Sequence, residues 1–563
     1  MMSGKFTAAG GLLSAAALAI AVSACGGGGA PASSGGTAAT GAAGKGGTLT
    51  ILSNQDFSHL DPARNWTMPH MDFGIRLLYR TLTTFKAEPG AGGTRIVPDL
   101  ATDLGTPSQG GKVWTFTLKS GLKYEDGTPI VADDVKYNVE RSFAPELPGG
   151  PNYAQLYLAD AEGYKGPLKG ERLKSIETPD EKTIVFRLKR PVAEFSYTVT
   201  LPTFAPVPKT KEAGEQYDNR PFSSGPYKIQ SYDRGKELVL VRNANWDPAT
   251  DPVRKAYPDK IVMKQGLRQS VIDDRLIDSR GEDATAVTYS DVTAASLAKV
   301  LPRPEVKARM VGEISGCTDM IGFNTAKAPF DDPRMRQAVH FALDKQALQT
   351  AQGGPDMAEI ATSYLPPALS GGRAQDVYGL PPTGDVEKAK ALLGGRTLDV
   401  AMTVSTGEKS LGEAVQSSLK RAGINVTLNP VDPSVYYDTI GDTAKSPEMF
   451  TYGWCPDYPS GATFLPMLFD GRTIVEKGNS GNVWQFKDKA VEARIDEIQA
   501  MTDTGAAATA WAELDRRIMR SSPAVPTLWD KKPLLVGTGV TGAFGHPVWS
   551  GQLDFSALGV KQG

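Results

Sequence analysis

The sequence predicts an α/β protein with more than one domain, and three observations support this. Across residues 398–428 an apolar strand-like stretch, a helical pattern and a second apolar stretch follow in order, the β-α-β rhythm of a mostly parallel sheet. The first half of the chain is instead rich in short alternating stretches between turn residues. The 563 residues are enough for two or three domains with cores of their own.

The individual elements follow from the same patterns. Alternation predicts strands at 48–52, 113–118, 183–188, 227–232, 238–242, 398–404, 424–428 and 526–536. Helical periodicity predicts helices at 72–82, 133–141, 411–421 and within 491–520, and helices that begin near Asp332 and Asp385. The paired carboxylates Asp133-Asp134, Asp273-Asp274 and Asp331-Asp332 are typical of helix caps rather than of acid/base dyads.

Composition excludes several classes of function. The net charge is −2, from 61 basic and 63 acidic residues, and no basic stripe suggests a nucleic-acid partner. Four histidines, at 59, 70, 340 and 546, are scattered without metal-ligand spacing, so we expect no metal site.

Catalytic motifs are also missing. The chain has no Gly-x-Ser-x-Gly, phosphate-loop or His-Glu-x-x-His motif. The stretch Ser417-Ser418-Leu419-Lys420 fits Ser-x-x-Lys, but the Lys-Thr-Gly and Ser-Asp-Asn companions of penicillin-binding proteins are missing. We therefore predict that the protein is not an enzyme and needs no cofactor.

Residues 1–24 are typical of an export signal. Lys5 precedes an apolar run at 11–22 that is too short to remain as a membrane span. The run ends at Val22-Ser23-Ala24-Cys25, which resembles a bacterial lipobox, whose cysteine receives a diacylglyceryl group. An ordinary cleaved signal with an incidental cysteine is the alternative. With a lipidated Cys25, residues 25–47, mostly Gly, Ala, Ser and Thr, form a flexible tether that holds the body at the outer face of a membrane.

One stretch, Tyr452-Gly453-Trp454-Cys455-Pro456-Asp457-Tyr458-Pro459, combines three aromatic residues with one carboxylate. Aromatic side chains favour burial, whereas a carboxylate resists it unless a cation or several donors meet it. No Lys or Arg lies between Lys445 and Arg472, so Asp457 has no local partner. Either Asp457 caps a turn beside core aromatics, or the stretch lines a pocket whose missing cation is a ligand.

Several segments together resemble the peptide/nickel type (family 5) of extracytoplasmic solute-binding proteins of ABC importers. They are Leu60-Asp61-Pro62, Trp114 to Asp134, Ser224-Gly225-Pro226-Tyr227, Arg242-Asn243, Phe323 to Asp344 and Gly453 to Leu465. The resemblance implies the two-lobed clamp of type II periplasmic binding proteins with an additional third domain. Lobe I then combines 48–92, 214–313 and 527–563, the additional domain is 93–213, and lobe III is 314–526.

The resemblance also implies a function and a site. Relatives capture oligo- or dipeptides between the lobes and deliver them to a permease and its ATPase subunits. A Trp-x-x-Asp motif holds the peptide ammonium in such relatives, and it corresponds here to Trp454-Cys455-Pro456-Asp457. Asp457 then anchors the ammonium, Trp454 and Tyr458 are apolar walls, and Gly453, Cys455 and Trp529 complete the expected ligand-binding set. We expect a monomer.

By the same resemblance, Cys317 and Cys455 form a disulfide, with two unpaired thiols as the alternative. Two departures from the family pattern stand out. Pro459 to Ala462 replace an acidic residue followed by proline, and Thr451-Tyr452 stand where some relatives place an arginine. Two further functions remain open: the same fold with a non-peptide solute, such as a nickel chelate, oligosaccharide or siderophore-like compound, or a peptide-sensing lipoprotein.

Overall fold

The computed structural model describes residues 44–367, 369, 375–474 and 481–561. The expected signal, the lipidated Cys25 and residues 26–43 of the expected tether lie outside this range. Residues 44–47, which we had assigned to the tether, instead contact the body: Gly44 pairs with Val560, and the Gly46 amide donates to the Tyr257 carbonyl.

None of the helices in the described ranges combines the length and the apolar character that a membrane crossing needs.

The first sheet has five strands in the order β11-β1-β10-β9-β8. Their bounds are Ala286–Thr288, Thr48–Leu52, Lys260–Lys264, Glu237–Arg242 and Tyr227–Asp233. Strand β1 is parallel to β10 and β11, and β9 is antiparallel to both of its neighbours. The predicted strands at 48–52, 227–232 and 238–242 are therefore confirmed.

A smaller antiparallel sheet follows the order β4-β5-β7-β6. Its strands are Thr106–Ser108, Val113–Thr117, Thr183–Arg187 and Ile176–Glu177, and they are accompanied by the helices α2 (Ala132–Arg141), α3 (Tyr153–Tyr157) and α4 (Phe195–Thr198). The carboxylate of Asp134 caps α2 by accepting a hydrogen bond from the Val131 amide at 3.0 Å. The rings of Phe186 and Phe195 meet edge to face at 5.3 Å in its core.

The largest sheet has six strands in the order β13-β17-β12-β16-β14-β15. Their bounds are Ala358–Ile360, Ala524–Leu535, Met310–Phe323, Met449–Trp454, Leu398–Ser405 and Ile424–Val431. The predicted β-α-β unit is confirmed, because β14 and β15 are parallel and α11 (Lys409–Lys420) connects them. The expected mostly parallel sheet is wrong, since β12 pairs antiparallel with both β16 and β17. Strands β12, β16 and β17 come from distant parts of the chain, and local periodicity does not predict the direction in which such strands pair.

The helices around this sheet begin and end where the sequence indicates. The carboxylates of Asp332 and Asp385 cap α8 and α10, and Gly394 ends α10 at φ 64°. Helix α8 spans Pro333–Ala342 and α10 spans Val386–Leu393. The other helices are α9 (Lys345–Ala351), α12 (Pro433–Gly441), α13 (Leu465–Phe469), α14 (Lys489–Gln499) and α15 (Thr504–Ser521).

Two helix predictions need correction. The helix expected at 72–82 is α1 (Met68–Phe73) followed by a single π-helical turn at Gly74–Leu78, which the Tyr79 amide closes by donating to the Gly74 carbonyl at 3.0 Å. Asp273 and Asp274 lie inside α5 (Gln269–Asp278) instead of capping it. Asp273 accepts hydrogen bonds from Thr293, the residue that caps α6 (Ala294–Val300).

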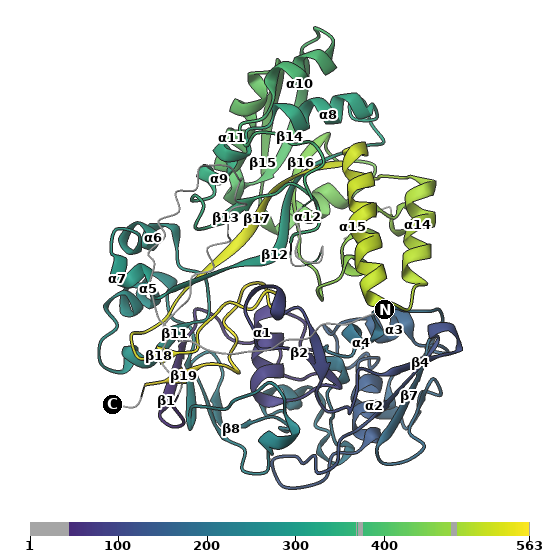
Figure 1. Ribbon diagram of the computed structural model, residues 1–563, viewed down its shortest axis with the longest axis vertical. Helices are drawn as coiled ribbons and strands as arrows, with labels where there is room; N and C mark the ends of the chain where they lie inside the picture. Colours follow the sequence, from purple (N-terminus) through teal and green to yellow (C-terminus); the bar gives the residue numbers. More distant parts are fainter. Residues whose placement is uncertain (1–43, 368, 370–374, 475–480, 562–563) are drawn as a thin grey trace, which may run out of the picture. The chain divides into compact units, whose positions relative to one another are not determined.

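The two longest strands, β12 and β17, run side by side for much of their length (Figure 1). Their register shifts between Ile314↔Lys531 and Thr318↔Trp529, so residues 315–317 of β12 bulge opposite Asp530. Gly316 within the bulge has φ +77°, a conformation that favours glycine. Beyond the end of β17, Val536 pairs with Val287 of β11. The long strand pair of β12 and β17 therefore connects the six-stranded sheet to the five-stranded sheet.

Candidate functional site

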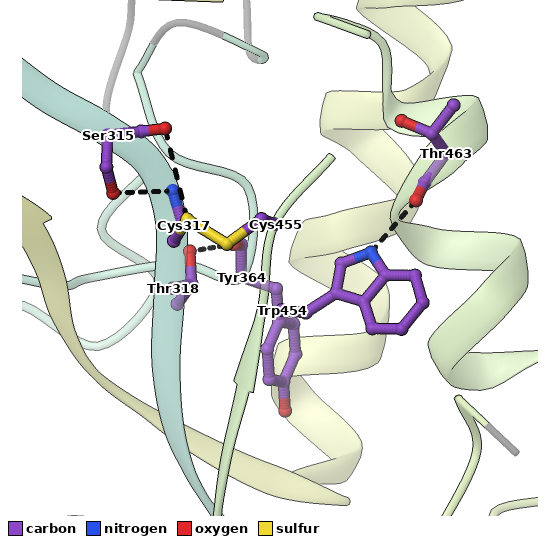
Figure 2. The surroundings of a disulfide bond; sticks show 7 residues. All are labelled: Ser315, Cys317, Thr318, Tyr364, Trp454, Cys455 and Thr463. Carbon is purple, nitrogen blue, oxygen red and sulfur yellow. Dashed lines mark hydrogen bonds between the residues drawn. A yellow bond between two sulfur atoms is a disulfide. The ribbon is translucent and has the colours of Figure 1, made fainter. Parts of the chain in front are cut away.

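Strand β16 positions the Trp-x-x-Asp motif. Gly453 pairs with Asp319 and Trp454 pairs with Thr318 on the neighbouring strand β12. The Trp454 indole is half-buried and donates its Nε1–H to the Thr463 carbonyl at 2.9 Å (Figure 2). It also stacks beside the ring of Tyr452. The indole is thus fixed at the end of the strand by one hydrogen bond and one ring contact.

The bulge in β12 brings Cys317 next to Cys455, and the structure joins the two as a disulfide (Figure 2). Within the bulge the Cys317 amide donates to the Ser315 hydroxyl at 3.2 Å. The bridge ties the residue after Trp454 to the long strand pair, which restricts where Asp457 can lie.

Asp457 has one hydrogen-bond donor among the described residues, the hydroxyl of Tyr153. No Lys, Arg or His of the described ranges lies within 4.0 Å of its carboxylate, as an ion pair requires. Burial raises the pKa of Asp457 to about 6, and the hydrogen bond from Tyr153 offsets this only in part. The carboxylate is therefore desolvated and lacks a counter-charge.

Tyr153 comes from α3 of the segment with the four-stranded sheet, and close packing holds it in place. A side chain at Gly150 would collide with the Ala63 carbonyl, so the chain before α3 lies directly on the loop that contains the Leu60-Asp61-Pro62 motif. Asp61 in that loop accepts two hydrogen bonds of 2.7 Å from Arg141 of α2. This buried pair attaches the loop, and with it α3, to the four-stranded sheet's helix.

Tyr458, the residue after Asp457, is buried rather than at an open surface. Its side chain is 1% exposed, and its ring contacts those of Tyr153 and Tyr197 at 5.8 and 6.1 Å. Tyr458 therefore packs against the residue that donates to Asp457.

The segment Pro459 to Ala462, where the chain departs from the family pattern, has a partner from the same segment as Tyr153. The Glu194 carboxylate accepts hydrogen bonds from the Ser460 hydroxyl at 3.0 Å and from Trp511 Nε1 at 3.2 Å. Burial raises the pKa of Glu194. Sequence reasoning missed both Glu194 and Tyr153, because nothing near them in the sequence indicates contacts about 300 residues away.

Trp529, the remaining predicted residue, lies on β17 opposite Thr318, which pairs with Trp454 on its other side. Directly paired residues share a sheet face, so both indoles are on the same side of the sheet. Trp529 is 3% exposed, and its Nε1–H has no hydrogen-bond partner among the described residues. The structure thus brings Trp529 near the motif.

The strand that carries the motif has an open edge. Strand β14 pairs with β16 only at Met402↔Met449 and Thr403↔Phe450. Residues 451–454 therefore have a strand partner only on the β12 side. The described residues contain no group of His, Cys, Asp and Glu that could hold a metal ion. The arrangement is suited to binding an extended, positively charged molecule.

The relatives of the chain agree with this geometry. The chain is 27% identical over 474 residues to the probable D,D-dipeptide-binding periplasmic protein DdpA of Escherichia coli K12, covering 81% of this chain and 83% of that protein. It is 26% identical over 458 residues to the periplasmic oligopeptide-binding protein OppA of Salmonella typhimurium LT2, covering 77% and 79%. Both relatives are named as peptide-binding periplasmic proteins.

Solved structures show the same fold. Clavulanic acid biosynthesis oligopeptide binding protein 2 has a TM-score of 0.86 and 34% identity, with 94% of this chain and 98% of that chain covered. The unliganded open form of the murein tripeptide-binding protein MppA has a TM-score of 0.76 at 22% identity, covering 92% and 98%. The fold is thus that of the type II periplasmic binding proteins. Residues 95–475 match the family described as "Bacterial extracellular solute-binding proteins, family 5 Middle", and the chain belongs to this family.

Proposed function

We propose that the protein is the peptide-binding component of an ABC importer, and that Asp457 holds the α-ammonium of the peptide. The observation that carries the proposal is the Asp457 carboxylate, which is desolvated, receives one hydrogen bond from Tyr153 and lacks a cation. A buried charge without a partner is unfavourable, and an ammonium group supplies the missing charge-assisted hydrogen bonds.

The open edge of β16 supports a peptide as the ligand. Residues 452–454 can pair with an extended backbone, which gives affinity independent of the side-chain sequence, whereas the Thr451 carbonyl already accepts a hydrogen bond from the Tyr436 hydroxyl. An extended chain advances about 3.3 Å per residue, so the first few residues of a peptide held at Asp457 lie along this edge. The names of the relatives, which include binding proteins for dipeptides and oligopeptides, agree with this ligand class.

The proposal extends to location and partners. The sequence of residues 1–47 supports export, lipidation at Cys25 and attachment to the outer face of the cell membrane. We expect the protein to act there as a monomer. From there the protein delivers its peptide to a membrane permease driven by ATPase subunits.

The first experiment identifies the ligand that the protein acquires in the cell. The protein is purified without a denaturation step and then unfolded, and the released small molecules are identified by mass spectrometry. We expect peptides with free amino termini from the wild type and from a surface control, Asp233→Asn, whose carboxylate is 65% exposed. Asp457→Asn releases few or none. A released non-peptide solute, or equal peptide yields from Asp457→Asn and wild type, contradicts the proposal.

A further inference from the structure

A small cavity lies beside the open edge of β16. Its volume is ≈ 120 Å³, and it is lined by Glu408, Tyr437, Tyr452 and Gly453, among others. It occupies the place where β14 and β16 diverge after Thr403↔Phe450. A side chain of a ligand that pairs with this edge can therefore enter it.

One carboxylate lines the cavity, and two further carboxyl groups lie behind it. Glu408 lines the cavity and accepts a hydrogen bond from the Thr451 hydroxyl at 2.6 Å. Asp319 lies directly behind Gly453, since a Cβ atom at that glycine would be 3.2 Å from Asp319 Oδ1. Asp530, opposite the bulge of β12, is close enough to Asp319 for each carboxyl to affect the pKa of the other.

The lysines near these three carboxyl groups pair with other carboxylates. The ammonium of Lys532 lies 3.4 Å from Asp291, and that of Lys409 lies 3.7 Å from Glu413. In the described ranges, none of the three carboxylates around the cavity forms an ion pair within 4.0 Å. Burial and the neighbouring carboxylates raise the pKa of Asp319 well above its usual range, and burial raises that of Asp530 to about 6.

Aromatic rings form the other wall. The Tyr437 side chain is 53% exposed, and its ring meets those of Tyr436 and Tyr452 edge to face at 5.6 and 6.3 Å. Tyr452 is 5% exposed and lines the cavity. Aromatic faces beside carboxylates attract guanidinium and alkylammonium groups, through the ring quadrupole and through charge-assisted hydrogen bonds.

We propose that this cavity is a subsite for a second cationic group of the ligand, so that the protein favours peptides with a lysine or arginine side chain at one position near the amino terminus. The inference rests on the proposed function, because the peptide must first be held at Asp457 and along β16. The subsite adds a preference for basic side chains to a site that otherwise binds only the peptide backbone.

The test compares tripeptides that differ at one side chain. Trialanine is substituted at each position in turn with lysine or with norleucine, which has a similar chain without the ammonium, and affinities are measured by calorimetry. We expect lysine to bind about tenfold more tightly than norleucine at one position, as one partly exposed charged contact provides. The ratio of the two affinities falls towards one in Glu408→Gln, which removes the charge that lines the cavity. The control Glu413→Gln, which removes an exposed carboxylate from the same helix region, leaves the ratio unchanged.

Each outcome has a distinct meaning. A lysine preference that disappears in Glu408→Gln supports the subsite. Tripeptide binding that depends on Asp457 but shows no lysine preference at any position overturns the subsite and leaves the proposed function intact. A lysine preference that Glu408→Gln retains also overturns it. If no tripeptide binds, the proposed function fails and the subsite fails with it.

Discussion

The hydroxyl of Tyr153 donates a hydrogen bond to the carboxylate of Asp457, which lies 304 residues further along the chain. The tyrosine belongs to a short helix beside the four-stranded sheet, and the aspartate follows a strand of the six-stranded sheet. The contact therefore couples the proposed ammonium anchor to a separate part of the fold. It also leaves the remaining hydrogen-bonding capacity of the carboxylate for a ligand.

Removal of this hydroxyl is expected to weaken peptide binding. The hydrogen bond from Tyr153 lowers the pKa of Asp457, so Tyr153→Phe raises that pKa further and reduces the ionised fraction near neutral pH. We expect affinity to fall by about 1–2 kcal/mol at pH 6 and by less at pH 8, measured by calorimetry. Tyr164→Phe, which removes a hydroxyl bonded to the Glu171 carbonyl, is the control. An equal loss at both pH values would show that Tyr153 does not act through the charge of Asp457.

Peptide affinity is expected to depend on pH through Asp457. The pKa of this carboxyl is raised to about 6, so the group is mostly ionised at pH 7.5 and mostly protonated at pH 5. Since the peptide ammonium remains charged over most of this range, affinity falls roughly tenfold between pH 7.5 and pH 5. Binding near pH 6 releases a proton, which calorimetry detects as a dependence of the enthalpy on the buffer. Asp457→Asn should remove both effects, and their persistence in that variant would assign them to another group.

The bridge between Cys317 and Cys455 is expected to stabilise the exported protein. It closes a loop with a sequence separation of 138 residues. On the chain-entropy view, such a loop contributes roughly 5 kcal/mol to the free energy of unfolding, as an upper figure. Cys317→Ser/Cys455→Ser should therefore unfold at lower denaturant concentration than the wild type. Thiol counting under denaturing, non-reducing conditions is the direct check, and two free thiols would refute the bridge.

Glu194 is expected to stabilise the loop after Asp457. Its carboxylate accepts from Ser460 and Trp511, both buried. Glu194→Ala leaves these donors without an acceptor and should reduce the free energy of unfolding by about 1–3 kcal/mol. Glu194→Gln retains an acceptor oxygen and avoids a buried charge, so it should be much less destabilising. Equal destabilisation by both substitutions in urea unfolding would contradict this role.

Local sequence patterns predicted much of the fold. The strands β1, β8 and β9, the unit β14-α11-β15 and the helix caps Asp332 and Asp385 all depend on nearby residues, and the structure has them where the periodicity indicates. The direction of pairing in the six-stranded sheet could not be predicted, because β12 and β17 meet strands from distant segments. The π-helical turn at Gly74–Leu78 was not predicted either, because apolar periodicity does not distinguish a π-helical turn from a continued α-helix.

The candidate site, like the fold, was predicted from the sequence only in part. The sequence indicates Asp457 as a carboxylate without a local partner, and the structure adds no cation within the described residues. The structure adds the donor Tyr153, the contact between Glu194 and Ser460, and the pair Asp319 and Asp530. These contacts join residues that are far apart in the chain or that a bulge brings together. Single-residue propensities carry no signal for such contacts.

The most direct test of the ammonium anchor compares one peptide with and without its charge. Trialanine and N-acetyl-trialanine differ at the amino terminus, where acetylation removes the positive charge. We expect the wild type to bind the free peptide at least about 30-fold more tightly at pH 7.5, because the acetylated form leaves the Asp457 carboxylate without a partner. In Asp457→Asn the two peptides should bind with similar, weak affinity. Equal affinity of the wild type for both peptides would contradict the account.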